Sequence, residues 1–346
     1  MIRFRTPMII FISIMIIFLM SLILMPTISA NEMSEEDITT EIDGNPVTSR
    51  AAIVIDHLTG LVIYEFNADE LRVPASMTKM LAVYVVLDAI NEGLISIEAY
   101  VQPSRAVRLF SYDRYYSNVP LPVNSFFTIR ELLDVVIVRS ASAATIALGE
   151  SIFGSEEAFV EKMNEKLIEL GIEGSFFDSW GGSPENRISA RGMAELTSAM
   201  IDDYPFILSF TSQKSVMFNE VEYASTNRLL YTYSGADGFK TGYTNPAGWC
   251  FTGTASVDGR RLISVTMGSV QAFRFQDSTI LLNHGYDSYD RIIANHFRNT
   301  LQQQNLHKNL RSPLVPIKMY EIKESQYFDL RFIALVLNEY NYPTQA

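Results

Sequence analysis

The chain has 346 residues, of which 48% are hydrophobic, and its formal net charge of -12 at pH 7 goes with a sequence pI near 4.9. This length and apolar content are enough for a substantial core and exclude a wholly disordered chain, while the absence of a concentrated basic patch excludes a nucleic-acid partner. Cys250 is the only cysteine, so the chain cannot form an internal disulfide.

The first 30 residues have the layout of a secretory signal. Arg3 and Arg5 precede an unbroken apolar run over residues 8–25, and small residues follow up to Ala30, where we expect cleavage. The alternative is an uncleaved anchor, because the run is also long enough to cross the apolar core of a bilayer. In both cases we expect the rest of the chain to be extracytoplasmic.

The first predicted elements of the fold are strands. Residues 31–49 are polar and acidic and are expected to form a flexible lead. Residues 51–56 and 60–66 are β-branched and aromatic runs on either side of a short polar stretch, which predicts a β-hairpin. Apolar side chains at helical spacing over residues 76–91 then predict a helix that begins at or next to Ser76.

The middle of the chain is predicted to be helical and its end to return to strands. Helices are expected over residues 129–138, 141–153, 156–170 and 189–203. Two apolar runs flank an Asp-Gly turn and predict a second hairpin, over residues 249–257 and 261–269. A closing helix is expected over residues 278–297.

Strands at both ends of the chain that enclose helices predict an α+β fold. We expect one antiparallel sheet formed from both chain ends, with helices packed on it. We expect a single domain over residues 50–289 and a short C-terminal extension, residues 290–346, of undefined structure. Within it, residues 326–340 are apolar enough for a strand, a packed helix or contact with a membrane surface.

Ser76 and Lys79 are the first residues with the chemistry of a catalytic pair. Their separation of three positions on a helix places both side chains on one face, within hydrogen-bonding reach. A neutral lysine can take the proton of the serine if desolvation and a second nearby cation depress its pKa, and a helix N-terminus favours negative charge at the serine. By itself, Ser-x-x-Lys is also typical of an ordinary surface helix start.

A second candidate segment, residues 237–244, precedes the second hairpin. There a strand edge can present Lys240 and Thr241 to a cleft, and Gly242 permits close approach of the backbone. Lys240 is then the candidate for the second cation beside Lys79. The alternative is an ordinary Lys-Thr-Gly at a strand entrance.

The two motifs together resemble a known superfamily. Ser-x-x-Lys followed at a distance by Lys-Thr-Gly is the signature of serine β-lactamases and penicillin-binding proteins. Residues 189–194, 226–230 and 247–250 are similar to stretches of low-molecular-weight D-alanyl-D-alanine carboxypeptidases. The similarity covers residues 50–287 and implies a β-lactamase/transpeptidase-like fold with Ser76 as nucleophile and Lys79 as base.

The middle motif departs from the pattern of this family. The family carries Ser-x-Asn on a loop between helices, and the matching residues are Ser140, Ala141 and Ser142, so a serine replaces the asparagine. The resemblance implies that Ser140 relays the proton to the leaving amine. Loss of the amide contact at Ser142 is expected to cost about 1 to 3 kcal/mol, which slows catalysis without abolishing it.

The resemblance implies further contacts with the substrate. The backbone N–H groups of Ser76 and Tyr243 would form an oxyanion hole. Arg274 aligns with a family arginine and would hold the terminal D-alanine carboxylate together with Thr241, with an ordinary surface position as the alternative. Substrate binding is thereby assigned to Ser142, Lys240, Thr241, Gly242, Tyr243 and Arg274.

Other chemistries find no support in the residues. The four histidines show neither the His-Glu-x-x-His spacing of a zinc site nor a Gly-x-Ser-x-Gly partner, so no metal or cofactor is expected. The aromatic residues within 110–116 and 126–127 either line a groove for peptidoglycan stems or pack under a loop.

The resemblance implies a carboxypeptidase that removes the terminal D-alanine from peptidoglycan stem peptides and is trapped by β-lactams. It would be secreted or associated with the outer face of the plasma membrane or the cell wall. One alternative is a β-lactamase or endopeptidase of the same fold, although no Glu-x-x-Leu-Asn loop is recognisable. The other is a catalytically weak or inactive wall-binding or morphogenetic homologue, in which Ser142 marks decay of the site.

Overall fold

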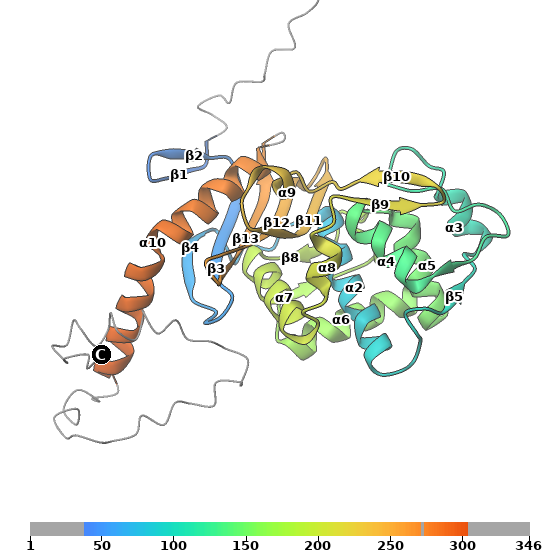
Figure 1. Cartoon of the computed structure of the whole chain (residues 1–346), viewed down its shortest axis with the longest axis horizontal. Coiled ribbons are helices and arrows are strands. Elements are labelled where there is room, and N and C mark those ends of the chain that lie inside the picture. Colours follow the sequence, from blue (N-terminus) through green and yellow to red (C-terminus); the bar gives the residue numbers. More distant parts are fainter. Residues whose placement is uncertain (1–37, 271–272, 304–346) are drawn as a thin grey trace, which may run out of the picture. The chain divides into compact units, whose positions relative to one another are not determined.

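A five-stranded antiparallel sheet is the central element of the computed structural model, which describes residues 38–270 and 273–303 (Figure 1). The strand order is β11-β12-β13-β3-β4. β3 pairs with β13, with Asp56 opposite Leu262, so both ends of the domain build one sheet and the predicted α+β fold is confirmed. The strands are β3 (Ala51–Asp56), β4 (Val62–Phe66), β11 (Ala236–Thr244), β12 (Gly248–Val257) and β13 (Arg260–Ser269).

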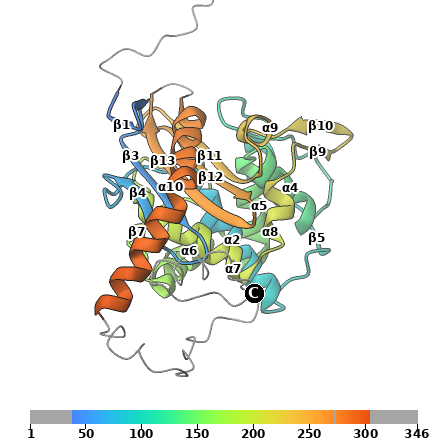
Figure 2. The same cartoon turned by 60° about the vertical axis from the view of Figure 1, so that its left-hand side comes forward.

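Both faces of the sheet are covered, because successive side chains of a strand point to opposite faces. Ile53 and Ile55 of β3 belong to a large core shared with most of the helices. Ala52 and Val54 belong to a second core, to which the helix α10 (Arg274–Gln303) contributes. All six residues of β3 are therefore buried. Figure 2, with α10 turned forward, shows this helix running along the sheet.

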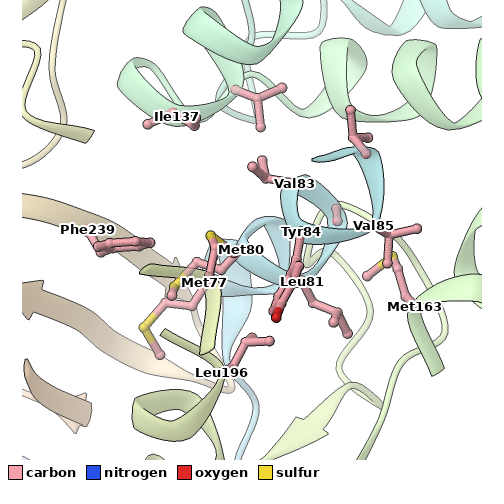
Figure 3. Packing of buried hydrophobic residues seen from close by; sticks show 14 of the residues in the cluster. Met77, Met80, Leu81, Val83, Tyr84, Val85, Ile137, Met163, Leu196 and Phe239 are labelled. Carbon is pink, nitrogen blue, oxygen red and sulfur yellow. The ribbon is translucent and has the colours of Figure 1, made fainter. Parts of the chain in front are cut away.

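The helices of the large core surround α2 (Thr78–Asn91). This helix buries 11 of its 14 residues, so it is apolar on almost every side, as expected of a central helix. Figure 3 shows Leu81, Val83 and Val85 pointing from α2 into the core in different directions. The surrounding helices lie where the sequence predicted them, within one residue at each end: α4 (Ile129–Val138), α5 (Ser142–Phe153), α6 (Glu156–Leu170) and α7 (Ala190–Asp203).

The second half of the predicted flexible lead is ordered. Residues 40–47 form a small antiparallel hairpin of β1 (Thr40–Ile42) and β2 (Asn45–Val47). Ile42 and Val47 are buried in the second core, and this apolar contact is the physical reason why the segment packs on the domain. The prediction of flexibility over residues 31–49 is therefore wrong for residues 40–47.

Buried Asp277 fixes the residues that follow this hairpin. Its carboxylate accepts hydrogen bonds from the Thr48 backbone N–H (3.1 Å) and hydroxyl (2.9 Å). The hydroxyls of Ser49 (2.5 Å) and Ser269 (2.8 Å) also donate to it. A buried carboxylate requires such donors, and here they join α10 to the end of β13 and to the residues that lead into β3.

The closing helix is longer than predicted. α10 runs from Arg274 to Gln303 and passes without interruption through residue 290, where the sequence predicted the C-terminal extension to begin. Tyr289 and Ile293 are buried in the second core, so apolar contacts continue across the predicted boundary. The predicted signal, residues 1–30, and residues 304–346 lie outside the described residues.

Several short elements connect these parts. They are β5 (Tyr100–Val101), α3 (Arg105–Phe110), β6 (Phe127–Thr128), β7 (Gly174–Ser175), β8 (Arg187–Ile188), α8 (Ile207–Thr211), β9 (Ser215–Phe218), β10 (Val221–Ala224) and α9 (Leu229–Thr232). In the described part of the chain, the structure contains no helix with the length and apolarity that a membrane span requires.

Candidate active site

Ser76 lies in a tight turn that leads into α2. A short 3-10 helix, Ala75–Met77, precedes the α-helix, and Ala75 has a positive φ of 49°, which is uncommon for a residue with a side chain. Ser76 is half-buried, so a substrate can still reach it. Lys79 follows one turn later, with its Nζ 3.0 Å from the Ser76 Oγ. The predicted pair is therefore in hydrogen-bonding contact.

Lys79 is completely enclosed, with 0% of its surface exposed. Besides the Ser76 hydroxyl, its Nζ contacts the main-chain carbonyl oxygen of Trp180 at 2.6 Å. Burial lowers the pKa of Lys79 from its ordinary 10.5 to about 7, against the opposing attraction of the Asp178 carboxylate. A large fraction of this lysine is thus neutral near pH 7, as a general base must be.

Ser140 and Lys240 form the second contact of the site. Ser140 lies between α4 and α5 with a positive φ of 65°, and its Oγ accepts a hydrogen bond from Lys240 Nζ at 2.8 Å. Burial lowers the pKa of Lys240 well below its ordinary value, and repulsion from Lys79 and Arg274 acts in the same direction. The predicted second cation therefore lies close enough to Lys79 for their charges to interact.

Gly242 lets β11, the edge strand of the sheet, lie against the Ser76 turn. A Cβ at this position would be 2.6 Å from the Pro74 carbonyl oxygen and 3.3 Å from the Met77 backbone nitrogen. The predicted close approach of the backbone is therefore present. Beside it, the Thr241 hydroxyl lies 2.8 Å from the hydroxyl of Thr226, which holds the side chain of Thr241 at this edge.

Ser142 is buried in the first turn of α5, but its side chain does not join the other groups. Its backbone N–H donates to the Ser117 carbonyl at 2.9 Å, and the next N–H, of Ala143, donates to Asn118 Oδ1 at 2.8 Å. Among the described residues the Ser142 hydroxyl has no hydrogen-bond partner. The structure thus brings Ser140, and not the Ser142 hydroxyl, into contact with one of the lysines.

Arg274 is buried at the start of α10 and is no ordinary surface residue. Its Nη1 donates to the Gly242 carbonyl at 3.2 Å, and its guanidinium lies 4.5 Å from the ring centroid of Trp249. Its Nε is buried without a partner among the described residues. Burial lowers the pKa of Arg274 to about 10. Its guanidinium thus lies beside the strand that carries Lys240 and Thr241.

The side chain of Tyr243 contacts Trp249 and Asn245. The side chain is 47% exposed and its ring lies 4.2 Å from that of Trp249, with the hydroxyl donating to Asn245 Oδ1 at 3.0 Å. The oxyanion hole that the family resemblance implies involves the backbone N–H of Tyr243 and not this side chain.

The turn that contains Asp178 and Trp180 was not predicted as part of the site. It contributes a main-chain carbonyl, which no side-chain motif reveals; the only sequence signal is an aspartate ahead of the pair Gly181-Gly182. The predicted aromatic residues lie next to it: the rings of Phe110 and Tyr116 lie 5.3 Å and 4.9 Å from that of Trp180. Tyr116 is still 37% exposed, so these contacts do not decide between the two alternatives for the aromatic residues.

Comparison with known proteins gives the same class as the geometry. Residues 37–271 match the peptidase S11 family, described as D-alanyl-D-alanine carboxypeptidase. The D-alanyl-D-alanine carboxypeptidase DacF of Bacillus subtilis (strain 168) is 32% identical over 250 residues, which are 70% of this chain and 63% of that protein. The chain thus spans less than two thirds of the length of this relative.

Solved structures of penicillin-binding proteins have the same fold. Penicillin-binding protein 5 from Haemophilus influenzae is 31% identical, with a TM-score of 0.67 over 71% of this chain and 73% of that chain. Penicillin-binding protein D2 from Listeria monocytogenes, in its ampicillin-bound form, is 29% identical, with a TM-score of 0.62 over 69% of this chain and 98% of that chain.

The fold and the two serine–lysine contacts define a protein of the penicillin-binding, transpeptidase-like class. Within that class, the match over residues 37–271 places the chain in the peptidase S11 family of D-alanyl-D-alanine carboxypeptidases.

Proposed function

We propose that this protein is a serine-type D-alanyl-D-alanine carboxypeptidase that removes the terminal D-alanine from peptidoglycan stem peptides. The observation that carries the proposal is the 3.0 Å contact between Ser76 Oγ and the enclosed Lys79 Nζ, whose pKa of about 7 suits a general base at neutral pH. DacF of Bacillus subtilis carries this activity in its name, and the structurally similar penicillin-binding protein D2 was solved with ampicillin bound.

In the proposed acylation, the Ser76 Oγ attacks the carbonyl carbon of the penultimate D-alanine while Lys79 takes its proton. Backbone N–H groups of Ser76 and Tyr243 would stabilise the resulting oxyanion. Ser140, held by Lys240 at 2.8 Å, relays the proton taken up by Lys79 to the departing amine as the C–N bond breaks, so Lys79 is neutral again and Ser140 keeps its hydroxyl. Water then hydrolyses the ester and restores the Ser76 hydroxyl.

The substrate would lie along the edge strand β11. Thr241 and Gly242 lie on an edge strand, which has a strand neighbour on one side only, and the Arg274 guanidinium, which donates to the Gly242 carbonyl, could pair with a terminal carboxylate. Ser142 is included in this binding surface as the residue at the asparagine position of the family motif. A β-lactam, which resembles the D-alanyl-D-alanine dipeptide, would acylate the same serine.

The place of action follows from the substrate. We propose an extracytoplasmic protein, secreted or associated with the outer face of the plasma membrane or cell wall, with residues 1–30 as signal or anchor and the peptidase domain over residues 50–289. A contact of residues 326–340 with the membrane surface belongs to the same proposal.

Labelling with a fluorescent penicillin tests the nucleophile. We expect covalent label on the wild-type protein and none on Ser76→Ala, and an unlabelled wild-type protein would exclude the proposed acylation. Release of free D-alanine from a pentapeptide, measured on the same preparations, tests the substrate. Rapid hydrolysis of penicillin without D-alanine release would instead indicate a β-lactamase.

A further inference from the structure

The turn over residues 178–183 lies directly against the Ser76–Lys79 pair. Its Trp180 carbonyl oxygen is 2.6 Å from Lys79 Nζ. Gly181, with a positive φ of 87°, packs on the peptide before Ser76, where an added Cβ would be 2.0 Å from the Ala75 carbonyl oxygen. The shape of this turn therefore determines where the Lys79 amine lies relative to the Ser76 hydroxyl.

Asp178 holds the turn in this shape. Its carboxylate accepts hydrogen bonds from the backbone N–H groups of residues 181–183, at 2.5 to 2.7 Å. A fourth donor is the Asn186 amide at 2.9 Å, and the same amide nitrogen lies 3.2 Å from the hydroxyl of Thr78, the residue before Lys79. Hydrogen bonds to an ionised carboxylate are stronger than neutral ones, so the side chain ties the turn to α2.

Proton transfer to Lys79 depends on the direction of its lone pair. A neutral amine has two N–H groups and one lone pair. When one N–H donates to the Trp180 carbonyl, the lone pair can face Ser76, whose hydroxyl then donates to the nitrogen across the 3.0 Å contact. We propose, building on the proposed function, that Asp178 is a positioning residue for this transfer: it shapes the turn whose Trp180 carbonyl orients the Lys79 amine toward Ser76.

The charge of Asp178 adds a second, separable effect. The charged groups near Lys79 are Asp178 from this turn and Lys240 from β11, with Arg274 of α10 acting on Lys240. Asp178 raises the pKa of Lys79 against the effect of burial. Neutralising Asp178 therefore lowers the pKa of Lys79, so the acidic limb of acylation moves to lower pH while the misoriented amine reacts more slowly.

The test measures the acylation rate by fluorescent penicillin between pH 5 and 9. For Asp178→Asn we expect a plateau at least tenfold lower and a midpoint at lower pH than in the wild type. For Asp178→Glu, which keeps the charge but shifts the carboxylate, we expect the lower plateau with the wild-type midpoint. The matched control is Glu156→Gln, because Glu156 holds the Ser179 N–H (3.2 Å) and hydroxyl (2.9 Å) of the same loop without acting on Lys79.

A wild-type plateau and midpoint in Asp178→Asn would overturn this inference alone. An equal loss of the acylation plateau in Glu156→Gln would also overturn it, because any damage to the loop would then be enough to slow acylation. An unlabelled wild-type protein would overturn the proposed function and this inference together. Thermal unfolding is measured for each variant, and if Asp178→Asn does not fold, an undiminished plateau in Asp178→Glu would reject the positioning role.

Discussion

Replacing Lys79 by methionine should stabilise the fold while it removes acylation. Lys79 is fully buried, and its pKa is about 7 in the folded protein against 10.5 as the ordinary value. The unfolded chain therefore holds this proton more tightly. Below pH 7 the cost of charging the buried amine is present in full, and it is relieved as the pH rises from 7 toward 10.5.

The difference between the two pKa values corresponds to about 5 kcal/mol. Methionine has a similar length and no charge, so Lys79→Met recovers this free energy at or below pH 7. The lost hydrogen bonds to Ser76 and to the Trp180 carbonyl offset about 1 to 2 kcal/mol each. The net expectation near pH 6.5 is a gain of about 1 to 3 kcal/mol, or about 2 to 10 °C in Tm for a domain of this size.

Thermal and denaturant unfolding of both proteins at pH 6.5 and 9.5 measures this gain. It should shrink by about 3 kcal/mol between these two pH values, because the wild-type protein loses its penalty as Lys79 becomes neutral in the unfolded chain. Lys166→Met is the matched control, since Lys166 pairs with Asp88 at 2.8 Å and its pKa is raised. The reasoning would be refuted if Lys79→Met were less stable than the wild type at pH 6.5, or if the difference in stability between the two proteins did not change with pH.

Three further outcomes test the site. The acylation rate of the wild type by fluorescent penicillin should rise with a midpoint near pH 7, because Lys79 must lose its proton, and a rate that is flat from pH 5 to 8 would contradict this role. Gly242→Ala should lower the rate about 100-fold, since the added methyl would lie 2.6 Å from the Pro74 carbonyl and push β11 from the Ser76 turn; a change of less than twofold would argue against this contact. Ser142→Asn should raise the rate up to about tenfold if the missing amide limits acylation, whereas an unchanged or lower rate in the same assay would mean that the site has adapted around the serine.

The sequence was most informative where a side chain determines both local structure and chemistry. Helix α4 has the capping box of Thr128 and Glu131 and a regular apolar stripe, so its bounds could be predicted to the residue. Helical spacing predicted that Ser76 and Lys79 share one face, but their roles were assigned only together with the Lys-Thr-Gly motif at Gly242, where glycine permits a close approach.

The parts that were missed depend on main-chain groups and on partners remote in sequence. The main-chain carbonyl of residue 180 accepts a hydrogen bond from Lys79, and it could do so with any side chain at position 180, so no sequence motif marks this contact. In the sequence, Asp277 is an ordinary acidic residue in the first turn of a helix. Its function as a buried hydrogen-bond acceptor depends on Thr48 and Ser49, more than 200 positions earlier in the chain. The same distant contacts explain why the strands β1 and β2, only three residues each, could not be predicted.

The pairing of β3 with β13 has a consequence for the order in which the protein matures. β3 is synthesised early, yet its partner strand is among the last parts of the domain to be made, and such distant pairings form slowly. Ser76 therefore exists long before Lys240 and the strand that carries it. A chain that stops before β13 already contains Ser76 and Lys240 but lacks the strand that joins β12 to β3, so the appearance of activity reports that the whole sheet has been completed.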